Sequence, residues 1–247
     1  MIIERTADEA TAIAADLFKC IACETVGQRD NCRVALAGGT TPHALYQLLA
    51  KGATTDAVPW RKVEVFFGDE RDVPQDHVES NYRMAQRTLL DHVPIEPGKI
   101  HPMPADAEDL AAASADYERT IRERVPAGPD GIPRFDLVFL GMGGDGHTAS
   151  LFPGTEMLSE KTKLVTSGFV PVLGRSRMTF TFPLINAAHN IIMLVTGTDK
   201  AQAVLGMLGE SPEIRAQLPA AGVNPREGSL IVVLDAAAAR LTGMSAG

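Results

Sequence analysis

The feature that most limits the possible folds is a set of short apolar segments that alternate with helical patterns along the chain. The clearest of these segments are residues 33–37, 63–67, 135–140, 191–195 and 229–234. A strand that is apolar throughout must be covered on both faces, and strands separated by helices pair in parallel. The sequence therefore predicts an α/β fold with a mostly parallel, Rossmann-like sheet and helices on both faces.

The helical patterns are punctuated by ordinary start and stop signals. Thr6 and Glu9 form a capping box ahead of apolar residues at helical spacing. Further helices are expected at residues 43–51, 79–91, 107–124, 199–208 and 236–241. Residues 163–169 and 178–182 alternate more and predict additional strands, which could form a small β lobe. Since no repeat or linker interrupts the pattern, we expect residues 1–247 to form one domain.

Composition narrows the class of protein. The 247-residue chain has a formal net charge of −8 and is 45% hydrophobic, which argues for a globular protein and against a general nucleic-acid binder. No signal peptide and no apolar run of about 20 residues is visible, so we expect a cytoplasmic protein with no membrane contact. Cys20, Cys23 and Cys32 suggest reduced thiols. Because Cys20 and Cys23 lie inside a helical pattern, we expect buried helix residues rather than a redox pair.

A glycine-rich turn follows the first of these strands. Gly38, Gly39, Thr40 and Thr41 precede Pro42 and a predicted helix. Two glycines let the backbone approach a ligand, Thr41 can cap the helix, and the N–H groups at its start favour an anion such as phosphate. The lysine of a P-loop is absent. A capped strand-to-helix turn without a ligand explains the pattern about equally well.

Charged residues follow the second strand. Asp69 and Glu70 could bind sugar hydroxyls or orient a catalytic group, and Arg71 could hold a phosphate or a developing oxyanion. The alternative is a solvated turn with a local ion pair, which is common.

The third cluster is the run from Gly141 to His147, which again follows a strand and matches G-x-G-x-x-G. A dinucleotide site is disfavoured because Pro153-Gly154 truncates the helix that should follow, and no strand ends in an acidic residue about 20 positions on. We favour a catalytic site, in which Gly143 and Gly144 bring the backbone close to a ligand. Asp145 and His147 would supply the chemistry, since an imidazole can take a proton from water near neutral pH.

Two later cations could complete an anion site. Arg177 opens a predicted strand, and Lys200 lies in the first turn of a predicted helix. Taken alone, each is more typical of a surface cation.

Together these residues resemble the 6-phosphogluconolactonase family. The matching stretches are residues 37–42, 68–71 with 73–74 and 80–82, 141–153, 177–186 and 197–201. The resemblance implies a sugar-phosphate isomerase-like fold without metal or organic cofactor. It implies a sugar-phosphate lactone as the small-molecule partner and hydrolysis of 6-phospho-D-glucono-1,5-lactone to 6-phosphogluconate. We expect His147 to activate water, while residues 38–41, Arg177 and Lys200 hold the phosphate.

Two other functions remain open on the same fold. Glucosamine-6-phosphate deaminase is similar, but that family carries a carboxylate five residues after the motif histidine, where this chain has Phe152, and favours Tyr at the position of Arg71. A non-catalytic sugar-phosphate sensor would not need to keep Asp69, Arg71 and His147. Phe152 and Arg71 both depart from the deaminase pattern and favour the lactonase. The sequence is compatible with either a monomer or a homodimer.

Overall fold

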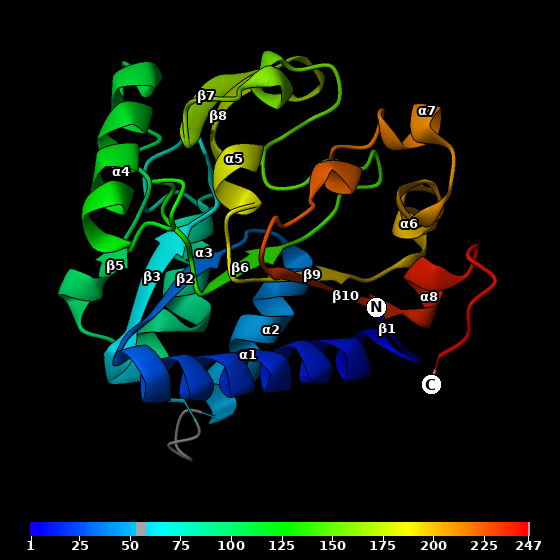
Figure 1. Cartoon of the computed structure of the whole chain (residues 1–247), viewed down its shortest axis with the longest axis horizontal. Coiled ribbons are helices and arrows are strands. Elements are labelled where there is room, and N and C mark those ends of the chain that lie inside the picture. The colour runs from blue at the N-terminus through cyan, green and yellow to red at the C-terminus, as the bar shows by residue number, and fades with distance from the viewer. Residues whose placement is uncertain (53–57, 247) are drawn as a thin grey trace.

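The central feature of the computed structural model, which describes residues 1–52 and 58–246, is a parallel seven-stranded sheet (Figure 1). Its strands run in the order β1-β10-β9-β6-β2-β3-β5 and every neighbouring pair is parallel. The bounds are β1 Ile2–Glu4, β2 Cys32–Leu36, β3 Val63–Phe67, β5 Ile100–His101, β6 Leu137–Leu140, β9 Asn190–Val195 and β10 Ser229–Asp235. The predicted apolar strands are confirmed. The edge strands β1 and β5 were not predicted, because two or three residues carry no periodic signal.

Helices cover both sides of this sheet. In Figure 1, α1 runs along the lower side, while α4 and α5 lie above the strands. The helices are α1 Ala7–Arg29, α2 Thr40–Lys51, α3 Asn81–Thr88, α4 Leu110–Arg124, α5 Phe182–Ile185, α6 Ala201–Leu208, α7 Pro212–Arg215 and α8 Ala236–Ala239. The predicted capping box is present, since Thr6 Oγ1 accepts from the Glu9 N–H and the Glu9 carboxylate accepts from the Thr6 N–H.

A second, three-stranded antiparallel sheet lies above the first in Figure 1. It pairs β4 Asp69–Arg71 with β8 Arg175–Phe180, and β8 with β7 Val165–Val170. The expected small β lobe is therefore present. The sequence did not reveal β4 as a strand, because three charged residues have no alternating apolar pattern.

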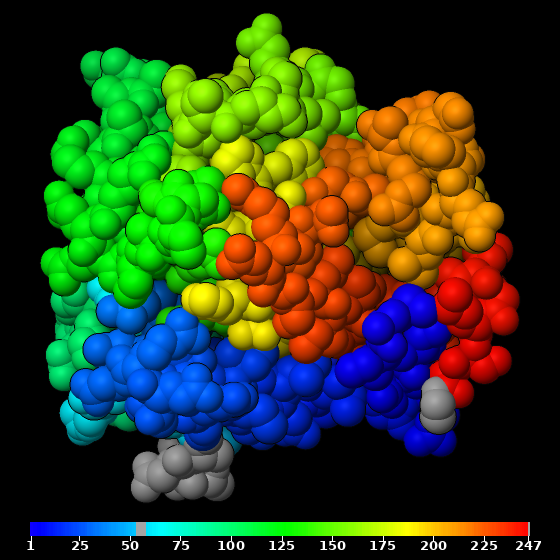
Figure 2. All heavy atoms as spheres, in the orientation of Figure 1, coloured from blue at the N-terminus to red at the C-terminus, as the bar shows by residue number. Residues whose placement is uncertain are grey.

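The C-terminal part of the chain braces the loop that contains His147. The segment after α7 lies beside α5 on the face seen in Figure 2, where the Asn186 amide donates to the Gly222 carbonyl at 3.0 Å. The Ala220 N–H donates to the Gly146 carbonyl at 2.9 Å. Gly146 has a φ of +79°, and a Cβ there would lie 2.5 Å from Leu218. The positive φ, together with this close packing, favours glycine at position 146.

The cysteine prediction needs one correction. Cys20 and Cys23 lie in α1 as expected, but both are exposed. The buried side of α1 is formed by residues such as Ala14, Phe18 and Ala22. Cys32 is buried in β2, and burial raises the pKa of its thiol to about 12.

Candidate active site

One cleft collects the carboxyl ends of the parallel strands. It has a volume of about 350 Å³. Its walls come from the loops after β2, β6 and β9 and from strands β4 and β8. Among the predicted site residues, the cleft is lined by Gly38, Gly39, Thr40, Thr41, Asp69, Arg71, Gly143, His147, Arg177 and Lys200. In open α/β sheets this edge is where ligands bind, and the three sequence clusters do meet there.

The loop after β2 presents backbone donors to the cleft. Gly39 has a φ of +104°, a backbone conformation that residues with a side chain rarely adopt. Helix α2 begins at the next residue. Within the described residues no side chain caps α2, so the expectation that Thr41 caps it is wrong. Thr41 is the second helical residue, and its hydroxyl instead lies 3.0 Å from Thr196 Oγ1. Residues 38–42 line the cleft, so the start of α2, where helix N–H groups favour an anion, lies at the cleft without a side-chain cap.

His147 is held by a carboxylate on one side and an aromatic ring on another. Asp145 Oδ1 lies 2.6 Å from His147 Nδ1 and also accepts from the His147 N–H at 3.1 Å. Phe152 stacks on the imidazole with ring centroids 4.0 Å apart. A Cβ on Gly143 would lie 2.1 Å from His147 Nδ1. A carboxylate can only accept, so the Nδ1–H of the neutral imidazole donates a hydrogen bond to Asp145 and Nε2 is left as the acceptor.

Two arginines face one another across β4 and β8. Arg71 and Arg177 are directly paired in the antiparallel register, and both line the cleft. Burial, followed by the charge of Arg71, lowers the pKa of Arg177. Like charges placed opposite each other destabilise a sheet, so a bound anion would relieve the repulsion. Lys200 adds a further cation at the cleft and lies 2.8 Å from the Asp199 carboxylate.

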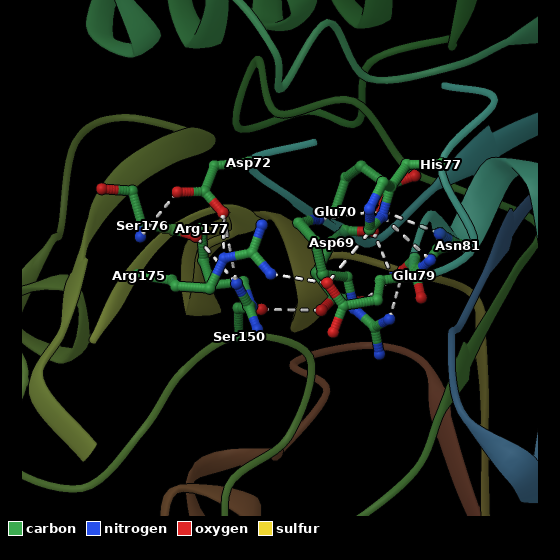
Figure 3. A network of polar contacts seen from close by, with 11 residues as sticks. Asp69, Glu70, Asp72, His77, Glu79, Asn81, Ser150, Arg175, Ser176 and Arg177 are labelled. Atoms are coloured by element: carbon green, nitrogen blue, oxygen red, sulfur yellow. Dashed lines mark hydrogen bonds and ion pairs between the residues drawn. The ribbon is translucent and has the colours of Figure 1, made fainter. Parts of the chain in front are cut away.

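The loop beside these arginines is held by an ion-pair network in which Asp72 and Glu79 are the acceptors. Arg175 donates to Asp72 at 3.1 Å and to Glu79 at 2.6 Å (Figure 3). Arg71 donates to the carbonyl of Glu79. The paired Arg175 lowers the pKa of Glu79, first through the hydrogen bond and then through its charge. This network fixes the position from which Arg71 reaches the cleft.

Three predicted site residues are not among the described residues that line the cleft: Asp145, Glu70 and Gly144. Asp145 is linked to the cleft through its contact with His147, which does line it. Gly144 packs against the carbonyl of Asp199, where a Cβ would be 3.1 Å from the oxygen. Glu70 is buried, and its carboxylate accepts from the N–H groups of Arg71, Asn81 and Tyr82 at 2.8 Å each. It also accepts from Ser80 Oγ at 3.1 Å. Glu70 thus anchors the start of α3, and the side-chain direction of a charged residue could not be read from its spacing.

We expect Glu70→Gln to lower the free energy of unfolding by about 1–3 kcal/mol, because the amide nitrogen cannot accept from the donors around it.

The same residue should make stability depend on pH. Burial raises the pKa of Glu70, and its three backbone donors oppose the rise. A raised pKa in an acid means that stability is lost as pH rises through the folded value, so the Glu70 variant should weaken this pH dependence at acidic pH. Urea unfolding measures both effects. Glu123→Gln on the exposed side of α4 is the control, and equal stability of the two variants would contradict the assignment.

Several cleft residues were not predicted from the sequence. Ala149 has a φ of +48°, and Ser150, Leu173 and Thr196 also line the cleft. Only Thr196, which precedes a glycine after a strand, carried a recognisable signal.

The part of the chain that the structure describes contains no group of three or more His, Cys, Asp or Glu side chains placed to hold a metal ion. None of its helices has both the length and the apolar character needed to cross a bilayer.

Comparison with known proteins gives a consistent family. A family model described as glucosamine-6-phosphate isomerases/6-phosphogluconolactonase matches residues 5–232. A 6-phosphogluconolactonase of Synechocystis sp. is 42% identical over 212 residues, which cover 86% of this chain and 85% of that protein. Another from Nostoc sp. is 40% identical over 213 residues, with the same coverage. The solved structure of 6-phosphogluconolactonase from Trypanosoma brucei is 29% identical, with a TM-score of 0.85 over 97% of each chain.

Proposed function

The chain belongs to the family of glucosamine-6-phosphate isomerases and 6-phosphogluconolactonases, and we propose that it hydrolyses 6-phospho-D-glucono-1,5-lactone to 6-phosphogluconate in the oxidative pentose phosphate pathway. The observation that carries this proposal is the pairing of His147 with Asp145 in a cleft that also holds two opposed arginines. A general base and an anion site together fit a phosphorylated substrate that reacts with water.

Phe152 separates this activity from the deaminase of the same family. A deaminase is expected to carry a carboxylate at this position to assist ring opening. Here the position holds a phenyl ring that packs on His147 with a 23° angle between the planes. A phenyl group can orient the imidazole but cannot transfer a proton, which favours hydrolysis of the lactone over deamination.

The substrate phosphate would be held by the N–H groups of residues 38–41 together with Arg177 and Lys200. A helix N-terminus and a guanidinium both bind phosphate oxygens through charge-assisted hydrogen bonds. Arg71, which is paired with Arg177 across β4 and β8, would add a positive charge on the side of the sugar ring. Asp69, which lines the same cleft, would accept hydrogen bonds from sugar hydroxyls.

His147 would act first as a base and then as an acid. Its Nε2 takes a proton from water as the water oxygen bonds to C1 of the lactone, and Asp145 stabilises the imidazolium that forms. Arg71 or N–H groups of the 141–144 loop stabilise the tetrahedral oxyanion. When the bond from C1 to the ring oxygen breaks, the imidazolium returns its proton to that oxygen. The ring opens to the free acid, which ionises to 6-phosphogluconate.

An assay on fresh 6-phosphogluconolactone tests the proposal. We expect the protein to accelerate formation of 6-phosphogluconate well above the spontaneous rate and to release no ammonia from glucosamine 6-phosphate. Ammonia release would indicate the deaminase. Tight binding of 6-phosphogluconate without any acceleration would indicate a sugar-phosphate sensor instead.

The remaining parts of the proposal concern the whole protein. Because both sheets contribute walls to the cleft, we propose that residues 1–247 act as one functional domain. We also place the enzyme in the cytoplasm, as a monomer or a homodimer.

A further inference from the structure

Hydrogen bonds from two other elements converge on Asp69 in β4, and packing joins a third segment to them (Figure 3). Ser150 comes from the loop that carries His147, and its hydroxyl donates to Asp69 Oδ2 at 2.7 Å. Asn81, the first residue of α3, donates from Nδ2 to the Asp69 carbonyl at 2.9 Å and to Oδ1 at 3.3 Å. Asn81 and Ser150 are only 2% and 1% exposed, so water does not compete for these contacts.

The third segment, the loop after β2, is joined through Gly38. A Cβ on Gly38 would lie 1.8 Å from Asn81 Oδ1 and 2.2 Å from Asn81 Cγ. The backbone of Gly38 is outside the left-handed region that favours glycine. Its missing side chain is therefore explained by the Asn81 amide that occupies the space, and not by the conformation of the main chain.

Asn81 cannot easily move away from Gly38. Its N–H donates to Glu70 Oε1 at 2.8 Å, and Ser80 caps the helix that Asn81 begins by accepting from the Arg83 N–H. The side chain is thus fixed at both its main-chain end and its amide end.

We propose that Asn81 and Ser150 are positioning residues that hold Asp69 and set the separation between the Gly38 loop and the His147 loop. The inference rests on the proposed function in treating these loops as the phosphate end and the reacting end of one substrate. The phosphate and C1 lie at opposite ends of that substrate. An error of about 1 Å in the separation of the two loops would misplace the carbonyl relative to His147.

Kinetics of single variants test the roles of Ser150 and Asn81 separately. Ser150→Ala should lower kcat about 10-fold and leave KM nearly unchanged, because it removes the hydrogen bond to Asp69 Oδ2 while Asn81 keeps its place against Gly38. Asn81→Ala should lower kcat and also raise KM, because it loosens both Asp69 and the Gly38 loop. Ser229→Ala, which removes an exposed hydroxyl, is the matched control and should match wild type. Wild-type kcat in both Ser150→Ala and Asn81→Ala would overturn the proposal.

A compensating pair tests the contact between Gly38 and Asn81. Gly38→Ala should weaken binding of 6-phosphogluconate, measured by calorimetry, by more than about 10-fold, since overpacking displaces the loop or Asn81. Adding Asn81→Ala in the same chain removes the clash and should restore most of the affinity. The kcat should stay low in the double variant, because Asp69 has lost the Asn81 amide. Gly98→Ala, at a glycine with open space around it, is the control.

Urea unfolding of wild type, Gly38→Ala, Asn81→Ala and the double variant separates this inference from the proposed function. The loss of stability from Gly38→Ala should be smaller in the Asn81→Ala background than in wild type. An equal loss in both backgrounds would show that Asn81 does not exclude a side chain at position 38, and the proposal would be wrong. If wild type fails to hydrolyse the lactone, the proposed function fails, while this cycle still decides whether the contact exists.

Discussion

His147→Ala is expected to lower kcat for hydrolysis of 6-phosphogluconolactone about 10²- to 10⁴-fold, the range typical of a lost general base. KM should change little, because the phosphate is held by other residues. The reason is geometric: Asp145 occupies Nδ1 at 2.6 Å and Phe152 fixes the ring plane, so the variant loses a base that is already aimed at the cleft. Initial rates corrected for spontaneous hydrolysis measure the effect.

A histidine that does not line the cleft provides the control for this variant. His92 is exposed, and its ring lies 2.9 Å from the carbonyl of Arg87. His92→Ala should therefore retain the wild-type rate. If His147→Ala keeps the full rate, the lactonase assignment can stand, but a base other than His147 must be found.

The second large effect is expected on binding. Arg177→Ala should raise KM about 10- to 100-fold, because charge-assisted hydrogen bonds to a phosphate are worth roughly 1.5–3 kcal/mol. Arg177 is directly opposite Arg71 and lies near Asp72, with 3.7 Å between Nη1 and Oδ1. Arg177→Lys keeps the charge but loses the planar fork, so its KM should lie between those of wild type and Arg177→Ala.

The unphosphorylated lactone separates phosphate binding from a general loss of structure. Turnover of glucono-1,5-lactone should be much less sensitive to Arg177→Ala than turnover of the phosphorylated substrate. Arg119→Ala, which removes an exposed arginine paired with Asp116, is the control for the loss of a positive charge. Equal losses on both lactones in Arg177→Ala would place Arg177 outside the phosphate site.

The site residues that come directly after an apolar strand could be placed from the sequence alone. Gly38, Asp69 and His147 each follow an apolar segment, and parallel strands bring their carboxyl ends to one edge. That placement holds wherever each segment sits in the sheet. Phe152 could be assigned to the same site for a different reason. It lies only five residues after His147 in the same loop, so the two side chains stay close together.

Side-chain directions were not predictable in the same way. Asp69 and Glu70 are neighbours in the sequence, yet Asp69 lines the cleft while Glu70 turns away to anchor α3. Thr41 was expected to cap α2 and instead contacts Thr196, 155 positions later. Cys20 and Cys23 were expected in the core and are exposed. For Glu70 and Thr41 the partner that decides the direction lies in another element, which a local pattern does not reveal.

The sequence by itself determined the parallel sheet, the order of its longer helices and strands along the chain, and the glycine-rich turns, because burial and backbone conformation depend on residue type and spacing within a segment. Only the tertiary structure decided which polar atoms meet. Ser150 reaches Asp69 across 81 positions, and Asn81 fills the space that Gly38 leaves open. Hydrogen bonds and close packing act over a few ångströms, so they are set after the strands have assembled and not by the pattern along the chain.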